Sequence, residues 1–381
     1  MSNLAVVGSS PAQLTVSNVY SWVFSNPFQA SSPIIRQGPT AETRAHHVPK
    51  VPSDKPLLID VTSGARATWA QVKNDALRVA ASLHDLGVRP RSNMPPVVSS
   101  PEDLLQPVVM IHLPNCIPFA SVLLGIFAAG LTATMANPTL APFELTWILE
   151  NSKPSVVVTT SEGQLALSKA IKELPVGQKP PAHVFVVDLQ HDTYGLENKK
   201  TSTTPAQTRD WKHLLSSTPL TSPVHLTPAQ CASQPALILW SSGTSGKSKG
   251  VMLSHSAMVH NILSLWHTNL HYNDSERWLG LPPFYHTFAL FNILLLAPAI
   301  GATVYCMRRF EPKVMLRCVQ EYRITYLHIA PPLALLLAKS DMVEGIDMSS
   351  VKGAVSGGAP CSSDIIEMVY RRLGILIQMV S

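Results

Sequence analysis

From Pro56 onward, the pattern of apolar and polar residues alternates between helical and extended stretches. Residues Thr68 to Leu86 and Pro118 to Gly130 read as helices. The short apolar runs Val108 to His112 and Ser155 to Thr159 predict strands. Strands that alternate with helices are typical of an α/β domain whose sheet is largely parallel.

Two long stretches carry no charged residue, Leu113 to Phe143 and Thr287 to Met307, and their length alone would allow membrane-spanning helices. Both are broken internally, the first by Pro118, Gly125, Gly130 and Pro138 and the second by Asn292, Pro298 and Gly301. A buried helix followed by a buried strand explains each stretch better. We therefore expect no transmembrane segment.

The last third of the chain predicts three further helices. Ser254 caps one that runs to about Trp266. Pro312 begins the second helix. One face of this helix carries Met315, Cys318, Val319 and Tyr322. The third runs from Asp364 to Leu373, with Asp364 and Glu367 expected as its cap and Gly374 as its stop.

Strands are predicted between these helices, at Ala302 to Met307, Tyr326 to Ala330, Gly353 to Ser356 and Ile375 to Val380. The second and third of these strands are each followed by a turn at the carboxyl end. In open α/β sheets that end is where ligands bind. The turns after Ala330 and Ser356 are therefore candidate positions for a site.

Other regions lack periodicity. The first 55 residues are Pro-rich, and we expect them to form an arm (1–55) that wraps the surface of a domain spanning 56–381, with the aromatic patch YSWVFSNPF at Tyr20 to Phe28. Residues Pro90 to Pro107 and Gly195 to Gln234 are rich in proline, serine and threonine. Both are predicted to be surface loops.

Composition narrows the classes of function. The 381 residues are 46% hydrophobic and 14% charged, as in a globular, rather apolar protein. The net charge of +5 comes from 29 basic and 24 acidic residues, and no run of lysine or arginine forms a stripe. This balance suits anionic small ligands and does not argue for nucleic acid.

The cysteines and histidines predict no metal site. The five cysteines are scattered and lack any C-x-x-C, which favours a reducing compartment. His267 and His271 are four residues apart but lack an H-E-x-x-H, so both are expected on the surface of a helix. No basic residue precedes Arg36, and the C-terminal Met379-Val380-Ser381 is not a peroxisomal signal, so we expect a cytoplasmic protein.

The segment WSSGTSGKSKG, Trp240 to Gly250, follows an apolar run and concentrates glycine, hydroxyl and lysine residues. Its ending resembles a P-loop, but Ser241 occupies the place of the leading glycine, and the residues after Gly250 look extended where a P-loop opens a helix. We predict a hairpin loop that binds polyphosphate through backbone N–H groups, hydroxyls and lysine. A flexible Gly/Ser surface loop is the alternative.

This segment resembles the signature loop of the adenylate-forming enzymes, which include acyl-CoA and aryl-CoA synthetases, luciferases and peptide-synthetase adenylation domains. The usual form is SSGTTGxPKGV, against SSGTSGKSKGV here, with Ser245 for threonine, Ser248 for proline and Lys249 at the family's lysine. Six further motifs resemble the family: LPN at 113–115, AAG at 128–130, ANPTLAPFEL at 136–145, LPPFYHTFAL at 281–290, APP at 330–332 and SGGAP at 356–360. The resemblance runs from about Tyr20 to Gln378 and is greatest to 4-coumarate:CoA ligase-like members.

The resemblance implies the large N-terminal domain of such an enzyme, with mostly parallel sheets flanked by helices, and it implies the site residues. His286 falls at the histidine that gates the acyl pocket, and a core histidine is the alternative reading. The implied catalytic residues are His286 and Lys249. The residues implied to bind the acid substrate are His286, Phe288 and Asn292. Phe288 brings an aromatic wall without a hydroxyl, which favours an apolar or aryl-alkyl acid over a phenolic one. The implied nucleotide-binding residues are Ser241, Ser242, Gly243, Thr244, Ser245, Gly246, Lys249, Ser356, Gly357, Gly358, Ala359 and Pro360.

The implied reaction joins a carboxylic acid to ATP, giving an acyl-adenylate and pyrophosphate, after which the thiol of CoA displaces AMP. Mg2+ and the loop would stabilise the phosphate charges. In the family, the magnesium glutamate and the lid domain lie beyond the point that corresponds to Ser381, so we expect this truncated chain to be poorly soluble and inactive by itself. The alternatives are a non-catalytic remnant that binds nucleotide or a partner and, more distantly, a P-loop-like NTPase or a membrane protein.

Overall fold

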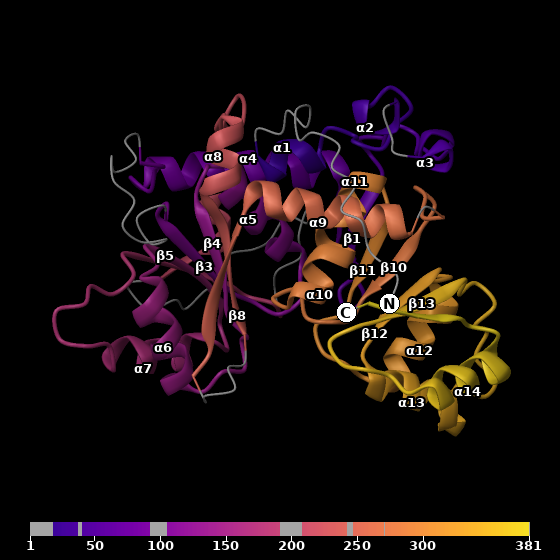
Figure 1. Ribbon diagram of the computed structural model, residues 1–381. Helices are drawn as coiled ribbons and strands as arrows, with labels where there is room; N and C mark the ends of the chain where they lie inside the picture. The colour runs from indigo at the N-terminus through magenta and orange to yellow at the C-terminus, as the bar shows by residue number, and fades with distance from the viewer. Residues whose placement is uncertain are drawn as a thin grey trace.

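The computed structural model describes residues 18–36, 40–91, 105–190, 208–241, 247–269 and 271–380. In this part of the chain, two seven-stranded sheets lie on either side of a shared layer of helices, and further helices cover the outer face of each sheet (Figure 1). The α/β fold predicted from the alternating pattern is therefore confirmed.

Both sheets are mostly parallel. We call them sheet A and sheet B. Sheet A has the order β14 (Ile377–Met379), β13 (Gly353–Ser356), β12 (Tyr326–Ile329), β10 (Arg277–Gly280), β11 (Thr303–Cys306), β1 (Pro56–Asp60) and β2 (Arg66–Thr68). Sheet B has the order β7 (Thr208–Asp210), β6 (His183–Val187), β5 (Val156–Thr160), β3 (Val108–His112), β4 (Thr132–Met135), β8 (Pro235–Ser241) and β9 (Lys249–Ser254). The pairs β1–β2 and β8–β9 are antiparallel.

The helices connect and cover these strands. The α-helices are α1 (Val19–Val23), α2 (Pro33–Arg36), α3 (Ala41–Ala45), α4 (Trp69–Asp85), α5 (Ile117–Ala128), α6 (Pro142–Ser152), α7 (Gln164–Lys172), α8 (Pro228–Ser233), α9 (His255–Thr268), α10 (Thr287–Ala289), α11 (Leu296–Ile300), α12 (Pro312–Glu321), α13 (Pro331–Lys339) and α14 (Ser363–Leu373). The short 3-10 helices of the described residues are η2 (Trp211–Leu214) and η4 (Asp341–Val343). A π-helix, η3 (Leu290–Leu295), joins α10 to α11.

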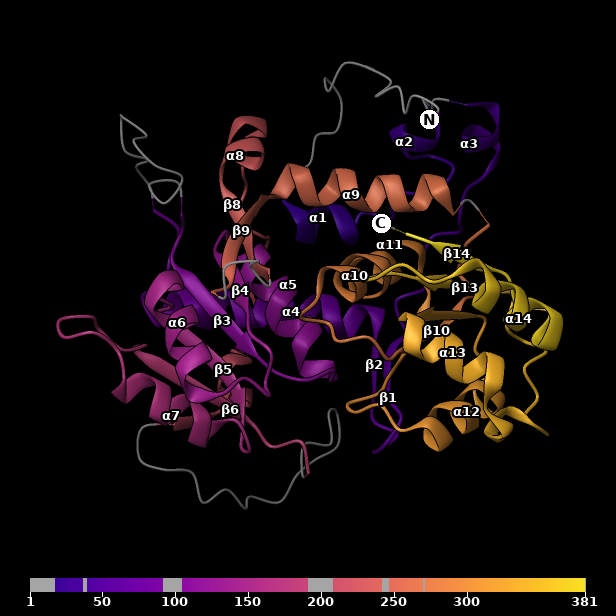
Figure 2. The same ribbon diagram turned by 60° about the horizontal axis from the view of Figure 1, so that its bottom comes forward.

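Strand β3 shows how the layers arise from the sequence. All five of its residues are buried. Val109 and Ile111 enter the core that sheet B shares with the central helices, whereas Met110 enters a smaller core against α6 and α7. Sheet A is covered in the same way, with α12, α13 and α14 on its outer face (Figure 2). Strands buried on both faces read as continuous apolar runs, which is why the sequence located them well.

The two uncharged stretches follow the predicted plan of a buried helix and a buried strand. The first holds α5, whose residues are all buried, followed by β4. The second holds α10, η3 and α11, followed by β11. Among the residues that the structure describes, no helix is both long enough and apolar enough to cross a bilayer.

The aromatic patch of the predicted N-terminal arm packs its rings into the core, and residues 1–17 of that arm lie outside the described residues. Tyr20, Trp22 and Phe28 are almost fully buried. Phe28 stacks on Trp266 of α9, with the ring centroids 4.1 Å apart. Asn18 anchors this segment by donating from Nδ2 to the carbonyl oxygen of Val224 at 2.8 Å. The burial of these aromatic rings therefore fixes the position of the segment, although the sequence around them is rich in proline.

Three finer predictions also need correction. Within Gly195 to Gln234, predicted as a surface loop, the structure places β7, η2 and α8, because Trp211, Leu214 and Cys231 are buried. Ser362, rather than Asp364 or Glu367, caps α14. His267 is half-buried on α9, whereas His271 lies beyond the end of that helix.

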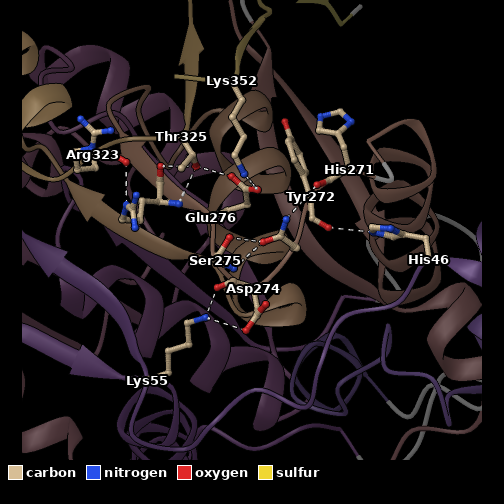
Figure 3. Close-up of polar contacts among 12 residues, drawn as sticks. His46, Lys55, His271, Tyr272, Asp274, Ser275, Glu276, Arg323, Thr325 and Lys352 are labelled. Carbon is tan, nitrogen blue, oxygen red and sulfur yellow. Dashed lines mark hydrogen bonds and ion pairs between the residues drawn. The ribbon is translucent and has the colours of Figure 1, made fainter. Parts of the chain in front are cut away.

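A buried carboxylate ties together the amino ends of three neighbouring strands of sheet A (Figure 3). Glu276, Thr325 and Lys352 immediately precede β10, β12 and β13. The Glu276 side chain is fully buried, accepts a hydrogen bond from the Thr325 hydroxyl and lies 2.7 Å from the Lys352 Nζ. The backbone N–H of Arg277 donates to the same hydroxyl at 2.9 Å. Ligands of such sheets bind at the opposite, carboxyl ends, so this cluster holds the strands in register.

Candidate nucleotide and acid site

The predicted hairpin around the signature loop is confirmed by strands β8 and β9. These strands pair from Pro235 with Ser254 to Ser241 with Lys249. Ser241 and Lys249 are both exposed, and the Ser241 hydroxyl donates to the Lys249 carbonyl oxygen at 3.4 Å. The predicted phosphate-binding residues Ser242, Gly243, Thr244, Ser245 and Gly246 lie outside the described residues. The two ends of the loop are nevertheless fixed at the carboxyl end of β8.

Helix α6 holds the returning end of this loop through Trp147. The indole Nε1 donates to the Ser248 carbonyl oxygen at 2.9 Å. The Lys247 Nζ lies 4.2 Å from the centroid of the same ring, within the range of a cation–π contact. Ser248 occupies the position of a rigid proline in the usual signature, and the hydrogen bond from Trp147 restrains it instead. Sequence reasoning missed Trp147, because a contact across 101 residues leaves no local pattern.

The LPN motif joins the two sheets. Asn115 is buried in the turn between β3 and α5. Its Nδ2 donates to the carbonyl oxygens of Gly280 and Pro282, each at 2.9 Å, and its Oδ1 accepts from the Phe284 N–H at 2.8 Å. These bonds fix the turn after β10, which carries the candidate histidine, against sheet B.

His286 is the N-terminal cap residue of α10, and its side chain is exposed. Its backbone N–H donates to the Pro283 carbonyl oxygen at 3.0 Å. The ring is still partly covered by its neighbours, and this partial desolvation lowers the pKa of its imidazole from the ordinary value, so the ring is mostly neutral at pH 7. The exposed ring does not fit the alternative of a core histidine.

Phe288 and the SGGAP turn lie against each other. A Cβ on Gly357 would lie 2.7 Å from the Phe288 Cδ2, so only glycine leaves room for the ring. Asn292 is buried, and its Nδ2 donates back to the Phe288 carbonyl oxygen at 3.0 Å inside the π-helical stretch. The structure thus brings Phe288 and Gly357 together as one wall, and the Asn292 amide bonds to its own helix.

The rest of the SGGAP turn is open. Ser356 is buried at the end of β13, and the Gly357 N–H donates to the Ile329 carbonyl oxygen at 3.2 Å. Gly358 has a φ of +86°, which favours glycine, and the space where its Cβ would stand is empty. Ala359 and Pro360 are exposed. A flat ligand could therefore approach this backbone without meeting a side chain.

Comparison with known proteins now identifies the family. A family model described as AMP-binding enzyme matches residues 45–380. The chain belongs to the AMP-binding enzyme family. Among curated members, it is 26% identical over 326 residues to 4-coumarate--CoA ligase 1 of Solanum tuberosum, covering 83% of this chain and 52% of that protein. It is 28% identical over 329 residues to 4-coumarate--CoA ligase of Pinus taeda, covering 84% and 53%. The chain spans about half the length of the curated relatives it matches.

Solved structures with the same fold cover nearly the whole chain. A red-emitting luciferase from Phrixothrix hirtus has a TM-score of 0.72 at 21% identity, over 97% of this chain and 61% of that one. The N-terminal domain of FACL13 from Mycobacterium tuberculosis has a TM-score of 0.68 at 20% identity, over 96% and 76%. At these identities the likeness shows the fold alone.

Members of this family are expected to use Mg2+ with ATP. Among the described residues, no three or more His, Cys, Asp or Glu side chains are grouped so that they could hold a metal ion. The ends of the signature loop offer hydroxyl and ammonium groups, whereas Mg2+ prefers carboxylate and phosphate oxygens. These residues therefore do not make a protein-held Mg2+ site.

Proposed function

We propose that this chain is the nucleotide- and acid-binding part of an ATP-dependent carboxylate:CoA ligase of the adenylate-forming type. The observation that carries the proposal is the β8–β9 hairpin, which frames the signature loop with the exposed Ser241 and Lys249. The curated relatives are named as CoA ligases, and one structure of the same fold is an anthranilate CoA ligase in complex with anthranoyl-AMP.

In the proposed reaction, a carboxylate oxygen of the acid attacks the α-phosphorus of ATP, and pyrophosphate leaves. The Lys249 ammonium and the hydroxyl of Ser241 would bind the phosphate oxygens, with backbone N–H groups of the loop between them. Donors aimed at the phosphate oxygens would stabilise charge as it moves onto pyrophosphate. The thiol of CoA then attacks the acyl carbon and releases AMP.

The acid would lie beside the wall formed by Phe288 and Gly357. An aromatic ring packed on a bare backbone favours an apolar or aromatic carboxylic acid. His286, exposed at the start of α10 and mostly neutral, would border the carboxylate end of this pocket. The adenine would lie on the open backbone of Gly358 and Ala359.

Replacing Lys249 by alanine is expected to weaken ATP binding by about 1–3 kcal/mol, the usual cost of a lost charged hydrogen bond. Isothermal titration calorimetry with ATP and Mg2+ measures this. Lys339→Ala is the matched control, because it removes the same charge from an exposed position on α13. Equal affinities in the wild type and Lys249→Ala would refute the assignment of the loop.

Carboxylate-dependent exchange between ATP and pyrophosphate separates the enzyme from the non-catalytic alternative. In a version of the protein extended with a complete family C-terminus, the enzyme proposal predicts exchange with an apolar or aromatic acid, and slower exchange or altered acid preference in His286→Ala without a change in ATP affinity. An extended version that binds ATP but shows no exchange with any acid would favour a nucleotide-binding role alone.

A further inference from the structure

The returning end of the signature loop is held by a side chain from another element. The β8–β9 ladder ends at the pair of Ser241 with Lys249. Lys247 and Ser248 lie just before β9, outside the strand pairing. The Trp147 indole on α6 contacts both of them: its Nε1 donates to the Ser248 carbonyl oxygen at 2.9 Å, and the Lys247 Nζ lies 4.2 Å from its ring centroid. One half-buried tryptophan therefore fixes a carbonyl group and an ammonium group beside Lys249.

Helix α6 gives these contacts a fixed support. Ile148 and Leu149, which follow Trp147 on this helix, are buried in the small core against sheet B. Trp240 of β8 packs against the same core, and its Nε1 donates to the Thr134 hydroxyl on β4 at 2.9 Å. The outgoing strand of the hairpin is thus tied to sheet B by one tryptophan, and the returning end is tied to α6 by another.

Ser248 makes this support necessary. It stands where the usual signature has proline, whose ring fixes the backbone angle φ. Serine lacks this restraint, and Gly246 and Gly250 stand two residues away on either side. The hydrogen bond from Trp147 supplies a restraint from outside the loop. A segment that is ordered before the ligand arrives binds it more tightly than one that the ligand has to order.

We propose that Trp147 is a positioning residue for the phosphate chain of ATP, which holds Lys247 and Ser248 where the second and third phosphates bind and so raises the affinity for ATP over that for AMP. This inference rests on the proposed function and deepens it. An ammonium group on an indole ring is held in place without losing its charge. With Lys249, it brings two positive charges to the returning end of the loop. AMP lacks the second and third phosphates and gains nothing from this arrangement.

The test measures binding of ATP and of AMP to the full chain by calorimetry, with Mg2+ present. Trp147→Phe keeps an aromatic ring and removes the N–H donor. We expect this variant to bind ATP about fivefold more weakly, the usual effect of losing one neutral hydrogen bond. Its affinity for AMP should change by less than about twofold.

Ser248→Pro in the Trp147→Phe background is the specific rescue. Proline places inside the loop the restraint that the indole supplies from outside, so ATP affinity should return to within about twofold of the wild type. Among the described residues, Ser248 is not one of the non-glycine residues with a positive φ, so its backbone angle has the sign that proline requires. If Trp147 only stabilised α6, a change in the loop would not restore ATP binding.

Trp69→Phe is the matched control. The Trp69 indole on α4 also donates to a backbone carbonyl oxygen, that of Pro298 on α11, at 3.0 Å. It also has a lysine beside it, with the Lys73 Nζ 5.0 Å from the ring centroid. This variant removes the same kind of donor from elements other than the hairpin and α6. It should leave the ratio of ATP to AMP affinity unchanged.

Three results would overturn the inference: unchanged ATP affinity in Trp147→Phe, equal weakening of ATP and AMP binding, or an ATP affinity that Ser248→Pro does not restore. Near-UV circular dichroism checks that the variants are folded, and Trp147→Met removes the same donor should Trp147→Phe unfold. If Lys249→Ala weakens ATP binding and Trp147→Phe does not, the role of Trp147 fails and the nucleotide site stands. If the wild type binds neither nucleotide, the proposed function fails as well.

Discussion

Replacing Lys352 by methionine lowers the free energy of unfolding by about 3 kcal/mol at neutral pH. The Glu276 carboxylate has no exposed surface, and the Lys352 ammonium 2.7 Å away balances its charge. Without that cation, a buried negative charge remains at the point where β10, β12 and β13 begin. Urea denaturation followed by circular dichroism gives the difference.

The double variant Lys352→Met with Glu276→Gln separates the buried charge from other effects. It should recover most of the lost stability, because the remaining amide is neutral. Arg371→Met, which breaks the exposed pair with Glu367 on α14, should cost less than about 0.5 kcal/mol. An equal loss in the single and double variants would mean that Lys352 acts through packing.

Acidification should cost the fold several kcal/mol through its buried histidines. Desolvation lowers the pKa of His112 and His255 to about 4 and that of His328 to about 3. Between pH 6.5 and these values, the unfolded chain binds protons that the folded chain cannot. Stability is therefore fully present above about pH 7 and falls as the pH drops through this window, on the order of 3 kcal/mol for each ring.

Denaturation curves at stepped pH values test this expectation. His255→Leu should flatten the dependence by about one proton between pH 6.5 and 4. Phe127 faces His255 with the ring centroids 6.0 Å apart, so Phe127→Leu alters the same part of the core without removing a titrating group. That control should shift the whole curve and keep its slope. An unchanged slope in His255→Leu would contradict the buried-histidine account.

The sequence predicted the regular elements well where burial dictates composition. Val108 to His112 and Gly353 to Ser356 are strands with the predicted ends, because strands covered on both faces have to be apolar throughout. Helix α4 begins where expected, since Thr68 and Gln71 form a capping box. In these cases the local sequence was sufficient to predict where the strand or helix begins.

The sequence failed where long-range packing decides. The polar composition of the run from Gly195 to Gln234 gave no sign of the 3-10 helix η2, which forms because Trp211 and Leu214 are buried. The contact of Trp147 with Ser248 and the bonds of Asn115 to the turn after β10 join residues more than 100 positions apart. The motifs could locate the candidate site, but they could not show which side chains hold it in place.

Hydrogen–deuterium exchange with and without ATP and Mg2+ tests the central claim, that the β8–β9 hairpin and the SGGAP turn form one nucleotide site. We expect ATP to slow amide exchange in peptides that cover 235–254 and 356–360, and Lys249→Ala to weaken both effects together. Unchanged exchange in both regions, or protection confined to other parts of the chain, would contradict the account.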